Sequence, residues 1–250
     1  MKTATKPEQC YWAEKDGNGT ITWADPLLTP AGTAQAVKAN AYYKSRFEEQ
    51  GLPYFQSYYS SPLKRCLQTA NTTFATGLNL PHHHGFKPTI KEKFREGISI
   101  HTCDHRSDKK VIRDMFPGAV FEKGFSEVDP LWRGKEGEGE TKAHQAQRSI
   151  EVLRDVFAHD DATWISISSH SGEIAALLAV LGHRQFSLST GQIIPVLVKG
   201  EKKRRGGGGD PLPSLTSATG PGFTPEATCN EPPVTSVSGT GCVCSQTSTP

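Results

Sequence analysis

A histidine stands at a turn between a strand-like segment and a helix-like segment in the second half of the sequence. His170 follows the alternating stretch 164–168 and precedes the apolar helical run 171–181, which ends at Gly182. The first turn of a helix offers free N–H groups and a partial positive charge to an anion. Ser171 and Gly172 are small enough for close approach to the backbone. An anion site and an ordinary loop histidine are equally compatible with this pattern.

A second turn of the same kind, residues 60–65, carries an arginine. The planar guanidinium of Arg65 matches the geometry of a phosphate group. Its helical position is nearly opposite the apolar stripe of the segment, which by itself favours a solvated arginine. Helical side chains lean toward the helix N-terminus, however, so Arg65 can reach a ligand at the end of the preceding strand.

A carboxylic acid, Glu96, stands in the segment Phe94 to Ser99. Placed beside a phosphoester, such a group can protonate the leaving oxygen. Taken alone, the position favours a surface glutamate.

The elements that would position these residues alternate between strands and helices. Thr29 and Pro30 are typical of a helix start, and Gly51 is typical of a helix end after about Gln50. A short strand is expected over 56–60 and another over 164–168. A final strand over 193–198 is interrupted by Pro195, which indicates an edge or irregular position.

Two further helices are predicted from apolar spacing of three and four residues. The helix that begins at Ser61 and Pro62 is expected to bury five side chains, namely Leu63, Cys66, Leu67, Ala70 and Phe74. The helix from Thr141 to about Ala158 is expected to bury four, namely Ala146, Ile150, Leu153 and Phe157. The alternation predicts a three-layer α/β/α sandwich with a mostly parallel sheet. Ligands of such sheets bind at the carboxyl ends of the strands, where Arg65 and His170 stand.

Composition narrows the class of protein. The 250 residues carry a formal net charge of +2, with 35% hydrophobic and 22% charged residues, which argues against a nucleic-acid partner. Six scattered cysteines and the absence of an apolar leader favour a cytoplasmic protein, and no apolar run is long enough for a membrane partner. Residues 201–250 are rich in Gly, Pro, Ser and Thr, so we expect a folded domain over 1–200 and a disordered low-complexity tail.

Four segments together are similar to motifs of the histidine phosphatase (phosphoglycerate mutase-like) superfamily, in particular its fungal members. They are LLTPAGTAQA at 27–36, SSPLKRCLQTA at 60–70, FREGISIHTCD at 94–104 and SSHSGEIAALLAVLG at 168–182. The resemblance covers roughly residues 10–200. It implies phosphomonoester hydrolysis or phosphoryl transfer through a phosphohistidine, with a small phosphorylated substrate and no metal or other cofactor.

The resemblance also implies a role for each candidate residue. Arg65 and Ser171 would bind the phosphate, His170 would stabilise the transferring phosphoryl group, and Glu96 would act as the acid and base. The segments around 97–135 would form much of a substrate lid. Arg106, Arg113, Phe121 and Trp132 are candidates for substrate contact there, although a surface or core role is favoured for each one individually.

One motif of the family is missing from the sequence. Members begin with a strand that ends in Arg-His-Gly and carries the nucleophilic histidine, whereas the first histidine here is His82. We therefore expect the first, central strand to be absent, with exposed backbone edges and an open apolar face. We also expect this chain to be inactive or nearly so. A late start site, a short isoform and a decayed enzyme would each account for this. A non-catalytic binder of phosphorylated ligands is the alternative function.

Two possible metal sites compete with this interpretation. Residues 14–25 resemble a calcium-binding EF-hand loop, but position one is Glu14 and position twelve is Asp25, so a turn of similar composition is preferred. A zinc site at His101, Cys103 and His105 lacks an obvious fourth ligand. His82, His83 and His84 are expected in a solvated loop.

Overall fold

Four parallel strands form the sheet of the computed structural model, which describes residues 11–81, 85–200 and 222–226. Their order is β3-β2-β1-β5. The register places Ser60 opposite Ile90 on one side and opposite Ser168 on the other. The strands are β1 (Ser57–Ser60), β2 (Thr89–Ile90), β3 (Val120–Phe121) and β5 (Ile165–Ser168).

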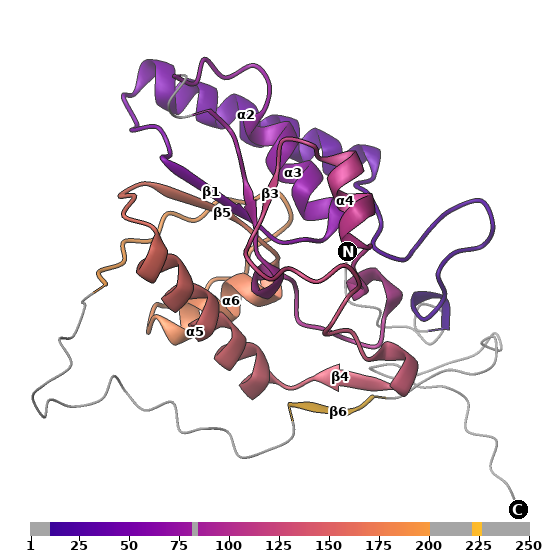
Figure 1. The fold of residues 1–250 in the computed structure, drawn as a ribbon. Helices are drawn as coiled ribbons and strands as arrows, with labels where there is room; N and C mark the ends of the chain where they lie inside the picture. Colours follow the sequence, from indigo (N-terminus) through magenta and orange to yellow (C-terminus); the bar gives the residue numbers. More distant parts are fainter. Residues whose placement is uncertain (1–10, 82–84, 201–221, 227–250) are drawn as a thin grey trace, which may run out of the picture.

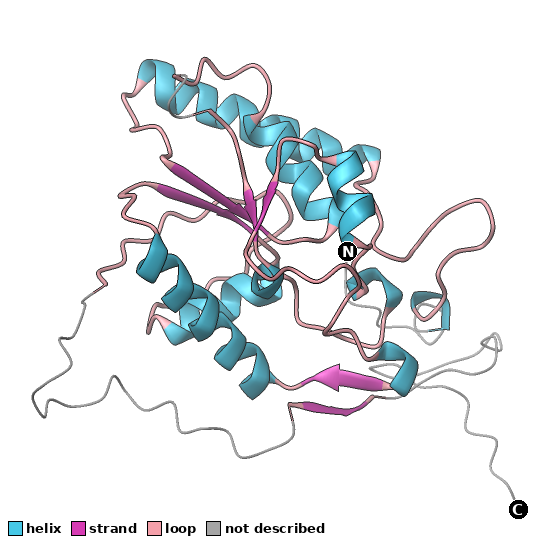
Figure 2. Ribbon diagram, viewed as in Figure 1, coloured by secondary structure: helices cyan, strands magenta, loops and turns pink. Residues whose placement is uncertain are grey.

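Helices cover both faces of this sheet, as Figures 1 and 2 show. On one face lie α2 (Pro30–Glu49), α3 (Lys64–Phe74) and α4 (Lys109–Met115). On the other face lie α5 (Lys142–His159) and α6 (Ser171–Val180). The predicted three-layer α/β/α sandwich with a parallel sheet is confirmed.

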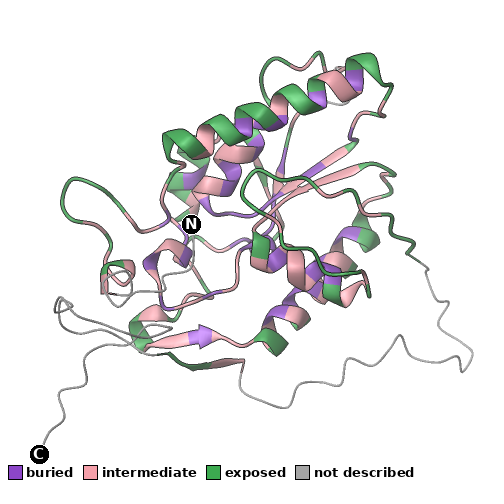
Figure 3. Cartoon of the chain, turned by 180° about the vertical axis from the view of Figure 1, so that it is seen from behind, coloured by how far each residue is buried: buried purple, intermediate pink, exposed green. Residues whose placement is uncertain are grey.

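Local sequence signals set the ends of α2. The Thr29 hydroxyl accepts a hydrogen bond from the Gly32 N–H at 3.2 Å, and Pro30 is the first helical residue. Gly51 adopts a φ of 65°, a left-handed conformation that costs glycine little, and the chain leaves the helix there. The outward surface of α2 is largely exposed (Figure 3).

Two apolar clusters lie between the sheet and the α2–α4 layer. The first is aromatic, and the second surrounds Leu67 and Ile90. The five side chains predicted to be buried by the helix after Pro62 are all buried. The aromatic cluster consists of Tyr43, Phe47, Phe55, Tyr58 and Phe74.

The inward face of α5 differs from the prediction. The expected set, Ala146, Ile150, Leu153 and Phe157, is only partly buried or, at Phe157, exposed. The buried residues are instead Gln145, Arg148, Ser149, Val152 and Val156. The prediction was wrong because it counted only apolar residues, whereas the helix turns a partnered arginine toward the core.

One expectation near the C-terminal part also needs correction. Residues 193–198 form no strand, and Leu197 is fully exposed. Within the segment expected to be disordered, β6 (Phe223–Pro225) pairs antiparallel with β4 (Glu138–Glu140). Phe223 packs against the ring of His144 and beneath Arg133, which supplies the apolar contact that the composition of the tail did not suggest. The boundary at residue 200 stays a prediction.

Within the described residues, β5 is the last strand on its side of the sheet. Nearby large apolar side chains are exposed, among them Phe157 and Trp164. Among the described residues, the structure also has the single-turn 3₁₀ helices η2 (Glu92–Phe94), η3 (Thr102–Asp104) and η4 (Gly134–Glu136).

Candidate functional site

The carboxyl ends of β1 and β5 lie side by side, and the residues that follow them meet. The Nε2 atom of His170 and the Oγ atom of Ser61 are 2.8 Å apart, within hydrogen-bond distance. This contact follows from the register, in which Ser60 and Ser168 are partners in adjacent strands. His170 is also the N-cap residue of α6, so its ring stands at the start of that helix.

Glu96 reaches the same helix start from the segment after η2. Its Oε1 atom accepts a hydrogen bond from the Glu173 N–H at 3.0 Å, and its Oε2 atom accepts one from the Gly172 N–H at 3.2 Å. A methyl group at position 172 would lie 2.3 Å from Glu96 Oε1, so a larger residue there would displace this carboxylate. The carboxylate thus binds where the helix dipole favours a negative charge.

Arg65 is not a solvated arginine. Its Nη1 atom donates to the Cys103 carbonyl at 2.6 Å, and its Nη2 atom lies 3.3 Å from Asp104 Oδ1. The side chain is 18% exposed, so it is largely buried as well as paired. Ser171, the other expected phosphate ligand, is exposed at the first position of α6.

The environment of His170 disfavours the charged form of its imidazole. Burial lowers its pKa well below the ordinary 6.5, and the positive charges of Arg65, Arg148 and Arg95 lower it further. A negatively charged ligand would counteract these charges, so this imidazole is suited to respond to an anion.

A buried ion-pair network supports Glu96 and the start of α6. Arg148 forms a bidentate pair with Glu140, and its Nη2 atom also lies 3.2 Å from Glu173 Oε2. Its nitrogens donate to the carbonyls of Lys93, Arg95 and Glu96 as well. Arg148 therefore fixes the backbone from which Glu96 projects.

Glu173 is a fully buried carboxyl group of this network. It accepts hydrogen bonds from the Ser149 hydroxyl at 2.7 Å and from the Gln145 amide at 3.3 Å. Burial raises its pKa to about 7, against the opposing effect of Arg148. The sequence interpretation missed Arg148, Glu140 and Glu173. A signal that could have found Arg148 and Glu173 is their place among small or apolar residues of predicted helices.

A second buried network holds the loops that were expected to form a lid. Arg95 pairs with Asp129 through its Nη1 and Nη2 atoms, each at 2.7 Å, and Glu92 bridges Arg95 and Arg106. Arg106 is 1% exposed and donates to four backbone carbonyls between 107 and 128. It is therefore a structural residue and cannot be the substrate contact considered for it.

The other lid candidates are packed against neighbours. Trp132 stacks on His105 with ring centroids 4.3 Å apart and donates to the His101 carbonyl. Phe121 packs on Phe125, and Arg113 lies over the Phe121 ring. These contacts agree with the core or surface roles that the sequence favoured for each residue.

The EF-hand alternative gains no support from Asp25. Its two carboxylate oxygens accept hydrogen bonds from the backbone N–H groups of Lys64 and Ser107, both at 2.8 Å. Asn18 accepts from two N–H groups inside its own turn. Among the described residues, no three or more His, Cys, Asp or Glu side chains form a group that could hold a metal ion. His82, His83 and His84 lie outside the described residues.

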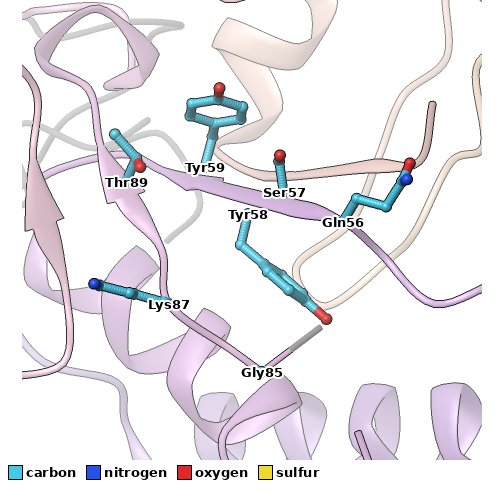
Figure 4. Close-up of a pocket in the computed structure, with 7 residues that line it drawn as sticks. All are labelled: Gln56, Ser57, Tyr58, Tyr59, Gly85, Lys87 and Thr89. Atoms are coloured by element: carbon cyan, nitrogen blue, oxygen red, sulfur yellow. The ribbon is translucent and has the colours of Figure 1, made fainter. Parts of the chain in front are cut away.

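A recess of 360 Å³ lies elsewhere, at the amino end of β1. It is lined by Gln56, Ser57, Tyr58, Tyr59, Gly85, Lys87 and Thr89. Figure 4 shows Tyr58 and Tyr59 projecting from opposite sides of the strand. Because Ser61 and His170 follow the other end of the strands, the recess is separate from the candidate site.

The chain belongs to the histidine phosphatase superfamily (branch 1), whose family description matches residues 12–193. It is 41% identical over 195 residues to a protein of Arthroderma benhamiae named "Probable phosphoglycerate mutase". It is 37% identical over 190 residues to "Phosphomutase-like protein 3" of Candida albicans. These matches cover 78% and 76% of this chain. The chain spans 57% of the length of each of the two relatives.

Solved structures are more distant. A phosphoglycerate mutase from Thermus thermophilus is 20% identical, with a TM-score of 0.37 over 68% of this chain and 78% of that one. A mycobacterial glucosyl-3-phosphoglycerate phosphatase is 18% identical, with a TM-score of 0.38 over 68% and 74%. In the described part of the chain, no helix has both the length and the apolar character needed to cross a bilayer.

Proposed function

We propose that this chain binds a small phosphorylated molecule at the carboxyl ends of β1 and β5. The observation that carries the proposal is that Glu96 and His170 both stand at the start of α6, where Glu96 accepts from the Gly172 and Glu173 N–H groups and His170 contacts Ser61. Arg65 lies close enough for its charge to act on His170. Membership of the histidine phosphatase superfamily supports phosphoryl chemistry for this arrangement.

Each residue has a role in this proposal. Arg65 and Ser171 bind the phosphate oxygens, and His170 stabilises the charge that develops on the transferring phosphoryl group. Glu96 protonates the oxygen that leaves as the P–O bond breaks. The family forms a new N–P bond on a histidine, and water or a second substrate then breaks it. No metal or organic cofactor takes part in these steps.

We propose further that the printed 250 residues bind phosphate esters without turning them over. Arg-His-Gly, the motif that supplies the family's nucleophile, does not occur in them. Arg65, Glu96 and His170 can bind and protonate, but they do not supply the covalent intermediate. Turnover would then require a longer protein that includes the nucleophile. We propose that this longer protein is cytoplasmic.

Thermal protection by vanadate and turnover of p-nitrophenyl phosphate test these proposals together. Vanadate should stabilise the wild-type chain, since a ligand at 100 times its Kd adds about 2.7 kcal/mol. Arg65→Ala should lose the protection, and Arg154→Ala, at an exposed position of α5, should keep it. Protection that survives Arg65→Ala would remove Arg65 from the site.

The p-nitrophenyl phosphate assay compares the 250-residue chain with a version that is extended upstream by a strand carrying Arg-His-Gly. We expect turnover only in the extended protein, and His170→Ala should abolish it. Turnover by the printed chain itself would mean that its nucleophile lies elsewhere and that the proposed roles are wrong.

A further inference from the structure

A short strand from the C-terminal part of the sequence, β6, pairs with β4 apart from the main sheet (Figure 1). Hydrogen bonds hold both of its ends. The Thr141 N–H donates to the Gly222 carbonyl at 2.9 Å, and the Glu226 N–H donates to the Gly137 carbonyl at 2.8 Å. The Glu226 carboxylate also accepts from the Ile100 N–H at 3.2 Å. The strand is therefore attached to three separate parts of the chain.

These contacts support the segments around Arg65. Ile100 stands two residues before η3, which supplies both partners of Arg65, namely the Cys103 carbonyl and the Asp104 carboxylate. Thr141 is the N-cap residue of α5. Release of β6 would remove an acceptor from the N–H groups of both Ile100 and Thr141.

Thr224 lies in the middle of β6, is exposed, and is followed by Pro225. Proline-directed protein kinases modify a Ser or Thr that precedes a proline, in a segment with an extended backbone. Of the other described residues that precede a proline in this way, Ser61 is fully buried and the Thr29 hydroxyl caps α2. Among the described residues, Thr224 is therefore the Ser/Thr–Pro position that is both exposed and part of a strand.

A carboxylate stands beside Thr224. The register pairs Thr224 with Gly139, so these two residues lie on one face of the two-stranded sheet, together with Glu226. The Glu226 side chain reaches over Gly139, where an added Cβ would lie 1.9 Å from its Oε1 atom. Cross-strand neighbours on one face are about 5 Å apart, so a phosphate on Thr224 would lie next to this carboxylate.

The cation that packs against β6 lies on the opposite face. Arg133 is placed over the Phe223 ring, 4.7 Å from its centroid, and pairs with Glu138. Phe223 and Glu138 project away from the face of Thr224, because side chains alternate along each strand. A phosphate on Thr224 would therefore meet a like charge on its own face, while Arg133 already has a partner on the other.

We propose that Thr224 is a phosphorylation site for a proline-directed protein kinase, and that its phosphorylation releases β6 from β4. The Thr224 Oγ atom forms a bond to the γ-phosphorus of ATP, the bond from that phosphorus to the β-phosphate oxygen breaks, ADP leaves, and the hydroxyl proton passes to solvent. The phosphothreonine carries a charge of about −1.5 to −2 at neutral pH and is repelled by Glu226. A two-stranded pairing with a three-residue strand has little stability of its own to oppose this repulsion. The inference goes beyond the proposed function and does not depend on it.

Amide hydrogen exchange tests the release, because the N–H groups of Ile100 and Thr141 both have acceptors supplied by the β6 segment. The 250-residue chain is incubated with ATP and a proline-directed kinase, and mass spectrometry locates the phosphate. Exchange at the two amides is then followed by NMR in the modified and unmodified proteins. We expect a phosphate on Thr224 and exchange about tenfold faster at both amides, as local opening becomes easier.

Two variants serve as controls. Thr224→Val lacks the hydroxyl, so it should carry no phosphate at this position and should keep the slow exchange after incubation with the kinase. Glu226→Gln keeps an oxygen that can accept from the Ile100 N–H but has no charge. Its phosphorylated form should therefore also keep the slow exchange.

Three outcomes would overturn the proposal. Absence of phosphate from Thr224 in the wild-type protein would remove the modification site. Phosphate on Thr224 with unchanged exchange at Ile100 and Thr141 would show that β6 stays on β4. Faster exchange that persists in phosphorylated Glu226→Gln would show that repulsion by Glu226 is not the cause.

Discussion

Arg148 and Glu140 form a bidentate ion pair inside the protein, with Nε–Oε1 and Nη2–Oε2 distances of 2.9 Å each. The Arg148 side chain is 3% exposed and that of Glu140 is fully buried. The pair joins α5 to β4, and through Glu173 it joins both to the first turn of α6. A buried charge without its partner lowers the free energy of unfolding, so removal of either residue is expected to destabilise the fold.

Removal of Arg148 should therefore destabilise the protein strongly. Arg148→Ala is expected to lower the free energy of unfolding by about 3–5 kcal/mol, because Glu140 and Glu173 remain buried without their cation. Urea denaturation measures the change. Arg154→Ala on the exposed side of the same helix should stay within about 0.5 kcal/mol of the wild type. A small effect at Arg148 would show that water reaches the network.

Glu173 should make stability depend on pH. Its pKa rises from the usual 4.5 in the unfolded chain to about 7 in the folded protein, so the folded state holds the proton more firmly. Its contribution is present below pH 4.5 and is lost as pH rises through 7, by up to about 3 kcal/mol. Glu173→Gln should remove this loss. The measurement is the difference between the two proteins' unfolding free energies across pH 4.5 to 8. A constant difference would contradict the raised pKa.

A side chain at position 172 should disturb the start of α6. Gly172→Ala would place Cβ 2.3 Å from Glu96 Oε1, so we expect a cost of about 1–3 kcal/mol and displacement of Glu96. Gly118→Ala is the matched control, because nothing lies within 4 Å of a Cβ there. Thermal unfolding of the two variants measures the contrast. Equal effects would show that Glu96 yields without strain.

Asp25 is expected to stabilise the fold by accepting backbone hydrogen bonds, and it is not expected to bind calcium. Asp25→Ala leaves the N–H groups of Lys64 and Ser107 without their acceptor, at a cost of about 1–3 kcal/mol. Asp25→Asn keeps one acceptor oxygen and should cost less. Addition of calcium should leave the unfolding temperature of the wild type unchanged. A calcium-dependent increase that Asp25→Ala abolishes would favour the EF-hand interpretation.

The sequence by itself determined the helices and strands with strong local signals. Thr29, Pro30 and Gly51 set the ends of α2 because capping and left-handed geometry depend on a few neighbouring residues. The alternation of elements then predicted the parallel sheet. It also placed Arg65 and His170 at the carboxyl ends of the strands, because parallel strands present these ends at one edge.

Only the tertiary structure decided which charged residues are buried and which groups already have partners. The inward turn of α5 depends on Glu140 and Glu173, which lie on other elements, so apolar spacing could not reveal it. The pairing of Arg65 with Asp104 and the seating of Glu96 on α6 are likewise contacts between distant segments. The energy of a buried charge depends on partners that the chain brings together only on folding.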